Sequence, residues 1–153
     1  MELVLIRHGE AERDAPRDEL RPLTARGTDE ARASGQRLAT LGLPSPFVVS
    51  SPYVRARTTA DIIATVLGSG PVRELRGITP DDNPRQAVLN LAQACQPGRT
   101  LVAVTHMPLI GSLIALLVDD DLRQARGVRT AGGVVLAGDF PMPGAMRIRT
   151  MLD

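Results

Sequence analysis

Two segments of the chain place a histidine directly after a hydrophobic run. Arg7, His8 and Gly9 follow a run of four aliphatic residues, and His106 follows the run LVAVT. No other histidine occurs in the chain. A third segment, SSPYVR, brings Arg55 close behind the hydrophobic run FVV. Histidine can act as a nucleophile near neutral pH, and arginine offers forked N–H donors to anions. Together these residue types favour chemistry on a phosphoryl group.

The pattern of hydrophobic and turn-forming residues predicts the elements that position these side chains. Short hydrophobic runs predict strands at residues 3–6, 47–51, 72–75, 100–106, 132–138 and 145–152. Helical spacing and capping residues predict helices between Thr24 and Gly42, from Pro52 to Leu67, from Pro84 to about Gln96, and from Pro108 onward. Strands that alternate with helices indicate an α/β fold with three layers, α/β/α, around a mainly parallel sheet. At this length we expect a single domain spanning residues 1–153.

The histidines and arginines named above are expected to meet at the carboxyl ends of the strands. In open α/β sheets, ligands bind beyond the carboxyl ends of the strands. If the three strands are neighbours, both histidines and both arginines converge there, and the helices that begin near Pro52 and Pro108 add positive dipole ends. Gly9 fits a tight turn that lets the backbone approach a ligand. The sequence therefore predicts an anion pocket.

A metal site is the alternative that these residues leave open. His8 and His106, joined by a carboxylate such as Asp18 or Glu10, could bind zinc. An arginine beside the ligands would repel a cation, so we favour a site without metal.

Composition narrows the classes of partner. The formal net charge is only +1, so no strong field draws the chain to nucleic acid or to an anionic membrane. The apolar segment LIGSLIALLV is too short to span a bilayer. Cys95 is the single cysteine, which excludes an internal disulfide and fits a reducing compartment. These features predict a cytoplasmic protein that binds neither nucleic acid nor membrane.

Four motifs lie in the same order along most of the chain as in one known family. They are RHGEAE, RPLTARGTDEAR, SSPYVRARTTA and VTHMPLIGSL. Together they resemble the histidine phosphatase superfamily, with its phosphoglycerate mutase-like fold, and specifically the short bacterial phosphohistidine phosphatases of the SixA type. The resemblance implies that His8 is the nucleophile and that Arg7, Arg55 and His106 bind the phosphoryl group. It also implies a mixed sheet with one antiparallel strand near the C-terminus.

The implied mechanism is in-line transfer of the phosphoryl group to His8. The neutral ring would attack phosphorus and form a phosphohistidine intermediate, which water then hydrolyses. The two arginines and His106, the latter preferably protonated, would neutralise charge on the phosphoryl oxygens. No metal or other cofactor is needed.

One departure from the larger members of the family concerns the general acid. Those members insert a helical cap that supplies a glutamate, but only about fifteen residues separate Gly68 from Pro84 here. We therefore expect no cap and an open, shallow site. Asp18 and Arg21 match positions near the pocket of SixA-type proteins, and Asp18 is the candidate for any residual acid or water-activating role. It could equally be a loop aspartate paired with Arg17 or Arg21.

An open site suits a phosphorylated side chain that another protein presents, because small metabolites need enclosure. We therefore predict a metal-independent protein phosphohistidine phosphatase whose partner is a phosphotransfer domain or a phosphocarrier protein. One alternative is a broad small-molecule phosphomonoesterase, of the sugar-phosphate type, on the same site. The other is a catalytically idle phosphoprotein-binding module, which would have no need of the nucleophile.

Overall fold

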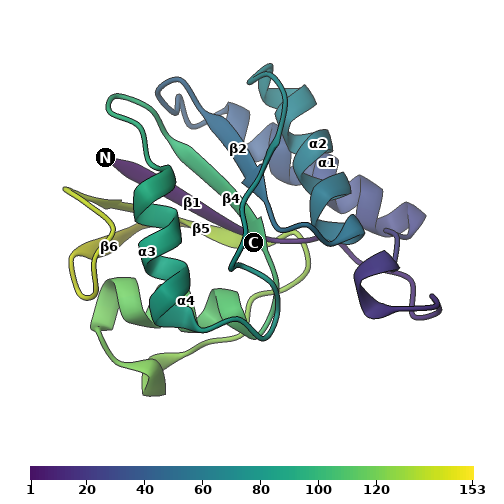
Figure 1. The fold of residues 1–153 in the computed structure, drawn as a ribbon. Helices are drawn as coiled ribbons and strands as arrows, with labels where there is room; N and C mark the ends of the chain where they lie inside the picture. Colours follow the sequence, from purple (N-terminus) through teal and green to yellow (C-terminus); the bar gives the residue numbers. More distant parts are fainter.

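A six-stranded mixed sheet forms the centre of the molecule, with helices on both of its faces (Figure 1). The computed structural model describes residues 1–153. The strands are β1 (Glu2–Arg7), β2 (Phe47–Ser50), β3 (Arg73–Glu74), β4 (Leu101–Thr105), β5 (Gly133–Gly138) and β6 (Met146–Leu152). The helices are α1 (Ala25–Ala39), α2 (Val54–Leu67), α3 (Pro84–Ala94) and α4 (Leu109–Asp119), with short 3-10 turns η1 (Asp18–Leu20) and η2 (Leu122–Gln124).

The sheet has the order β3-β2-β4-β1-β5-β6. Strands β3, β2, β4 and β1 pair in parallel. Strand β5 runs antiparallel to β1, and β6 runs antiparallel to β5. The predicted mainly parallel mixed sheet is confirmed, and β5 is the one strand that runs against the others.

Strand alternation in β1 builds the two cores that hold the layers together. Leu3 and Leu5 pack in the hydrophobic cluster under α3 and α4. Val4 and Ile6 face the opposite cluster, under α1 and α2. All four side chains are fully buried, and each such burial stabilises the fold by roughly 2 kcal/mol. The predicted three-layer α/β/α arrangement follows from this division.

The start of α2 differs from the prediction. The helix begins at Val54 rather than at Pro52, and Ser51 does not cap it. Tyr53 is the residue before the helix, and its carbonyl accepts from the N–H groups of Ala56 and Arg57. The Tyr53 N–H donates to Ser51 Oγ, which keeps this segment in a turn and delays the helix.

The segment between α2 and α3 contains only β3 and turns, so no helical cap is inserted there. None of the helices combines the length and the apolar character that crossing a membrane requires.

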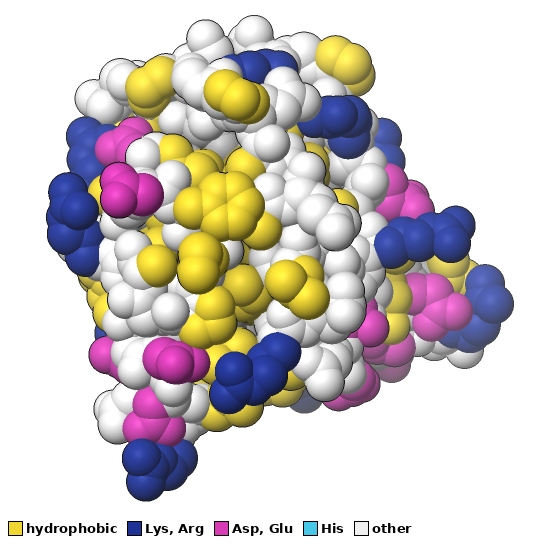
Figure 2. Space-filling model, turned by 60° about the vertical axis from the view of Figure 1, so that its left-hand side comes forward, with side chains coloured by type: hydrophobic (Ala, Val, Ile, Leu, Met, Phe, Trp, Pro, Cys, Tyr) yellow, Lys and Arg dark blue, Asp and Glu magenta, His cyan; other side chains and the backbone are white.

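Hydrophobic side chains are also exposed on one face of the molecule. Figure 2 shows them gathered there, and no histidine is visible on that face. The exposed large hydrophobic residues include Leu89 of α3 and Phe140 and Met142 in the turn between β5 and β6. Because β5 is antiparallel to β1, with Ala137 opposite Glu2, this turn lies near the amino end of β1. The residues that follow β1 therefore lie at the opposite end of the sheet, beyond the carboxyl end of this strand.

Two glycines let the N-terminus of α1 approach the loop after β1. A Cβ on Gly27 would lie 2.0 Å from the Glu10 carbonyl oxygen, and a Cβ on Gly9 would lie 2.4 Å from the Gly27 carbonyl oxygen. Neither position has room for a methyl group, because the obstructing atoms are backbone. Gly9 therefore serves close packing of the loop that carries His8.

We expect Gly27→Ala to lower the free energy of unfolding by roughly 2 kcal/mol or more, since overpacking against backbone forces the helix away from the loop. Urea unfolding would measure the change. Gly127→Ala is the matched control, because a Cβ there meets nothing within 4 Å; its effect should stay within about 0.5 kcal/mol. Equal effects of the two substitutions would show that the glycine contact does not hold α1 in place.

Candidate active site

The carboxyl ends of β1 and β4 bring the two histidines together. The strands are parallel, with Arg7 opposite Thr105, so His8 and His106 leave the sheet side by side. The His8 N–H donates to the Thr105 carbonyl oxygen at 3.0 Å. The two imidazole rings lie 5.1 Å apart between centroids, and both residues are buried.

Arg55 reaches the same point from the first turn of α2. Its Nε donates to His8 Nε2 at 3.2 Å, and the residue is 4% exposed. Arg7 lies at the end of β1, where its Nη1 donates to the Val128 carbonyl oxygen at 2.8 Å. Burial, opposed by Glu30 and reinforced by Arg55, lowers the pKa of Arg7. The structure thus places Arg7, His8, Arg55 and His106 at one edge of the sheet, as the sequence predicts.

Two hydrogen bonds fix the protonation pattern of the His8 ring. Nδ1 lies 2.7 Å from the Gly9 carbonyl oxygen, which can only accept, so Nδ1 carries the proton. Nε2 faces the Nε–H of Arg55, which can only donate, so Nε2 presents its lone pair. Both contacts therefore select one neutral tautomer. A nucleophilic histidine needs this lone pair on the nitrogen that faces the ligand.

Burial keeps both histidines neutral. Burial first, opposed by the hydrogen bond to Gly9 and reinforced by the charges of Arg55, Arg7 and Arg21, lowers the pKa of His8 to about 4. For His106, burial first, then His8 and Arg55, lower the pKa to about 2. The expectation that His106 is protonated is therefore wrong for the ligand-free protein. The ring is desolvated and has cations for neighbours, so a proton on it is disfavoured.

We expect neither histidine to take up a proton when the pH is lowered from about 8 to about 5.5, although model histidine titrates at about 6.5. Because these are the only two histidines in the chain, proton NMR titration can follow each ring after assignment with one single variant. Uptake of a proton by either ring near pH 6.5 would contradict the burial that the structure shows.

The same two pKa values make the stability depend on pH. Each histidine has a lower pKa in the folded state than in the unfolded chain. At pH values between those two pKa values, the unfolded chain therefore binds more protons than the folded protein. The contribution of the two neutral histidines to the free energy of unfolding is therefore fully present above about pH 6.5. It is lost as the pH falls toward the folded-state pKa values. Urea unfolding should show a loss of roughly 1 kcal/mol per histidine between pH 7.5 and pH 5.5. His8→Ala should remove about half of that pH dependence.

Asp18 and Arg21 lie beside Arg55, and Asp18 acts as its counter-ion. Asp18 Oδ2 accepts from Arg55 Nη2 at 3.1 Å, and Oδ1 accepts from Arg21 Nη1 at 3.0 Å. The Asp18 carbonyl oxygen accepts from Arg55 Nη1 at 2.7 Å. Arg17 pairs instead with Glu19. Of the two roles considered for Asp18, the structure shows the ion pair, with Arg55 as a second partner that the local sequence does not reveal.

The ionisation of Asp18 does not suit a proton donor. Burial raises its pKa, but hydrogen bonds and charge from Arg21 and Arg55 outweigh that effect and hold the pKa below its ordinary value. Asp18 is therefore a carboxylate at neutral pH. Its contacts fit a different task, which is to hold the Arg55 guanidinium beside His8.

The donor set does not fit a metal ion. No group of three or more His, Cys, Asp and Glu side chains is arranged to hold one. The lone pair of His8 Nε2, which a cation would need, faces the guanidinium of Arg55. Asp18 is already paired with two arginines.

Three further residues of the site escape a reading of the sequence. Thr59 Oγ1 accepts from the Gly9 N–H at 3.0 Å and donates to the Arg55 carbonyl oxygen. The Tyr53 ring meets the His106 ring edge-on at 5.0 Å and lies under the Arg55 guanidinium. Ser51 Oγ lies 2.6 Å from His106 Nε2. All three belong to the motif SSPYVRARTTA, whose spacing could have identified Thr59, one helical turn after the arginine.

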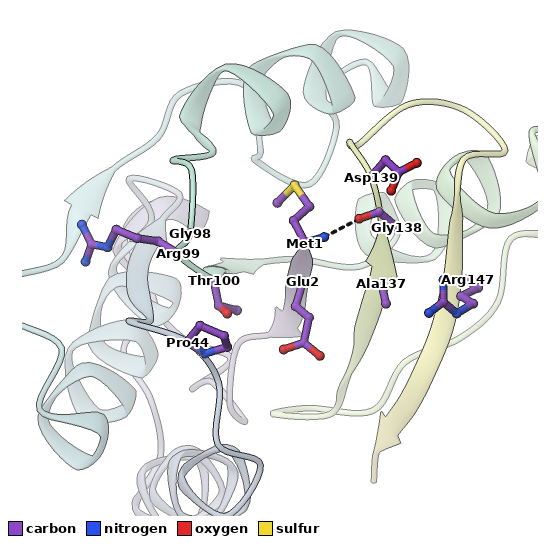
Figure 3. Close-up of a pocket in the computed structure, with 10 residues that line it drawn as sticks. All are labelled: Met1, Glu2, Pro44, Gly98, Arg99, Thr100, Ala137, Gly138, Asp139 and Arg147. Atoms are coloured by element: carbon purple, nitrogen blue, oxygen red, sulfur yellow. Dashed lines mark hydrogen bonds between the residues drawn. The ribbon is translucent and has the colours of Figure 1, made fainter.

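The two histidines and Arg55 are buried beneath the surface of the site. A shallow hollow of about 420 Å³ beside it is lined by Arg13, Ala15, Asp18 and Arg21. A hollow of about 550 Å³ lies elsewhere, around Met1 and Glu2 at the amino end of β1, and contains neither histidine (Figure 3). Its lining mixes both signs of charge, including Glu2, Asp139, Arg99 and Arg147. Neither hollow includes His8, His106, Arg7 or Arg55 in its lining.

Comparisons with known proteins agree on one family. A family model described as histidine phosphatase superfamily (branch 1) matches residues 3–79. The phosphohistidine phosphatase SixA of Escherichia coli (strain K12) is 31% identical over 119 residues, covering 76% of this chain and 74% of the relative. A structure of the protein histidine phosphatase SixA complexed with tungstate has a TM-score of 0.88 at 25% identity, covering 100% of this chain and 97% of that one. A phosphoserine phosphatase from Entamoeba histolytica, 18% identical, shares the fold with a TM-score of 0.73, covering 99% of this chain and 96% of the other.

Proposed function

Because the chain belongs to the histidine phosphatase superfamily, we propose that it removes the phosphoryl group from a phosphohistidine side chain of another protein. The observation that carries this proposal is the state of His8, a buried neutral ring whose Nε2 lone pair faces Arg55. Similarity to SixA over three quarters of the chain supports the substrate class. The tungstate in the SixA structure is an oxyanion with the tetrahedral shape of phosphate.

In the proposed reaction, His8 Nε2 attacks phosphorus while the bond from phosphorus to the substrate imidazole breaks. Arg7 and Arg55 lie close enough to His8 to lower its pKa, and they would bind the phosphoryl oxygens as charge redistributes. For this, Arg55 must exchange its hydrogen bond to His8 for one to the phosphoryl group. Water then attacks phosphorus on His8, releases inorganic phosphate and restores the neutral ring.

The leaving group explains why no general acid is required. A phosphohistidine whose second ring nitrogen carries a proton releases a neutral imidazole, whose conjugate acid has a pKa of about 6.5. An alkoxide that leaves from a phosphate ester is far more basic and needs a proton donor. Asp18 is ionised and paired with Arg55, so it cannot readily provide that proton. We further place the reaction in the cytoplasm, within one domain of residues 1–153, with a phosphotransfer domain or a phosphocarrier protein as partner.

A small-molecule phosphomonoesterase is the second candidate, because the phosphoserine phosphatase shows that this fold also hosts such enzymes. No helical cap lies between α2 and α3, and a site without that cover suits a protein-borne substrate better than a metabolite, which needs enclosure. An idle binding module would gain nothing from a neutral, desolvated His8.

A panel of phosphohistidine proteins tested beside phosphoserine and a sugar phosphate separates these candidates. We expect kcat/KM for the best phosphohistidine protein to exceed that for each alkyl ester by roughly 100-fold or more, because a general acid typically contributes about 10²- to 10⁴-fold. Release of inorganic phosphate would be measured, and excess EDTA should leave the rate unchanged. Faster turnover of an alkyl ester than of every phosphohistidine protein would overturn the assignment, and loss of activity in EDTA would revive a metal site.

A further inference from the structure

Ser51 is the residue that contacts His106 most closely. It follows β2 directly, its N–H donates to the Val104 carbonyl oxygen, and its side chain is completely buried. Its Oγ lies 2.6 Å from His106 Nε2. Since His106 is also completely buried, water cannot replace this hydrogen bond.

The direction of this hydrogen bond follows from counting protons. The Ser51 hydroxyl has one proton and two lone pairs. The Tyr53 N–H donates to the oxygen at 3.3 Å and occupies one lone pair. The only acceptor within reach of the hydroxyl proton is His106 Nε2. If Nε2 were itself protonated, both the Ser51 proton and the Nδ1 lone pair would be buried without a partner, whereas the other tautomer leaves only the Nδ1 proton unpaired; each such unpaired group costs about 1–3 kcal/mol.

We infer that Ser51 is a positioning residue, whose hydroxyl holds His106 in the Nδ1–H tautomer and so makes a neutral ring into a hydrogen-bond donor for the phosphoryl group. His106 Nδ1 is buried and has no partner in the protein, as expected of an atom whose partner is the ligand. The opposite tautomer would turn a lone pair toward anionic oxygens. The catalytic part of this inference rests on the proposed function, whereas the tautomer of the ligand-free protein does not.

Nitrogen-15 NMR of the ligand-free protein tests the tautomer directly, because protonated and unprotonated ring nitrogens have well-separated shifts. His8→Ala assigns the two rings. We expect His106 to show a protonated Nδ1 and an unprotonated Nε2 in the wild type. In Ser51→Ala, Nε2 loses its donor, and the ring should shift toward the Nε2–H tautomer. A wild-type ring with a protonated Nε2, or an unchanged ring in Ser51→Ala, would overturn the inference.

Ser50→Ala is the matched control. Ser50 is equally buried, but its hydroxyl donates to the Ser51 carbonyl oxygen and not to a histidine. Its removal can destabilise the same strand without touching the His106 tautomer. If Ser51→Ala does not fold, Ser51→Cys keeps most of the volume and offers only a weak donor; it should shift the ring in the same direction, and an unchanged ring would again overturn the inference.

Turnover of p-nitrophenyl phosphate provides the second readout. We expect Ser51→Ala to lower kcat by about 10- to 100-fold with a smaller change in KM, as when the partner of an active-site histidine is lost. Ser50→Ala should stay near wild type. Equal losses in both variants would reduce Ser51 to a structural role. If the wild-type protein released no phosphate from any phosphohistidine protein while the tautomer was as expected, the proposed function would fail and the assignment of Ser51 would stand.

Discussion

His8→Ala is expected to abolish turnover while leaving the binding of a phosphate analogue within roughly tenfold of wild type. The substitution removes the group that we propose forms the covalent intermediate. His8 Nε2 is unprotonated, buried and in contact with Arg55, as the proposed attack requires. The arginines that we propose bind the anion remain, and this is why binding should survive.

Three measurements separate this expectation from simple unfolding. Phosphate release gives the turnover, tungstate inhibition or binding gives the affinity, and a rapid quench with labelled substrate should trap label on His8 in the wild type alone. His8→Gln is a second variant that fills more of the space without the imidazole. Near-normal turnover by either variant, or label on another residue, would end the assignment of His8 as the nucleophile.

The positions of the site residues could be predicted because each depends on a local pattern. His8 and His106 each follow a hydrophobic run of strand length, and parallel neighbours end at one edge of a sheet. Arg55 follows the third such run. Hydrophobic runs and turn residues determine where strands end, so the convergence requires no knowledge of the side-chain contacts.

The neutral state of His8 is expected from the sequence, but the state of His106 could not be predicted, because it depends on contacts between distant segments. The neutrality of His106 comes from burial and from the nearby His8 and Arg55. Ser51 and Pro52 have the local pattern of a helix start, yet the Ser51 hydroxyl meets a histidine 55 residues further along the chain. A strong contact made in the folded state outweighs a weak capping preference, and the sequence pattern carries no sign of it.

Arg55→Lys is expected to lower kcat/KM by roughly 100-fold even though the positive charge is kept. The guanidinium uses three nitrogens at once. Its Nε donates to His8 Nε2, and Nη1 and Nη2 donate to the carbonyl and carboxylate oxygens of Asp18. A lysine ammonium is a single point donor on a flexible stem, so it cannot hold Asp18 and also present a planar fork to two phosphoryl oxygens. The loop that carries Asp18 should loosen as well.

Arg57→Lys is the matched control for this substitution, since Arg57 lies on the same helix and makes an exposed pair with Asp61 at 3.4 Å and one long hydrogen bond, also 3.4 Å, to the Val72 carbonyl oxygen. Such pairs contribute little, so this variant should stay within about twofold of wild type. Comparison of kcat and KM for both variants, with urea unfolding to measure stability, isolates the part that Arg55 plays in the reaction. Because we propose that Arg55 leaves His8 for the phosphoryl group as the reaction begins, the loss should appear mainly in kcat. A loss of less than about threefold in Arg55→Lys would show that charge alone suffices and that the forked geometry at His8 is not used.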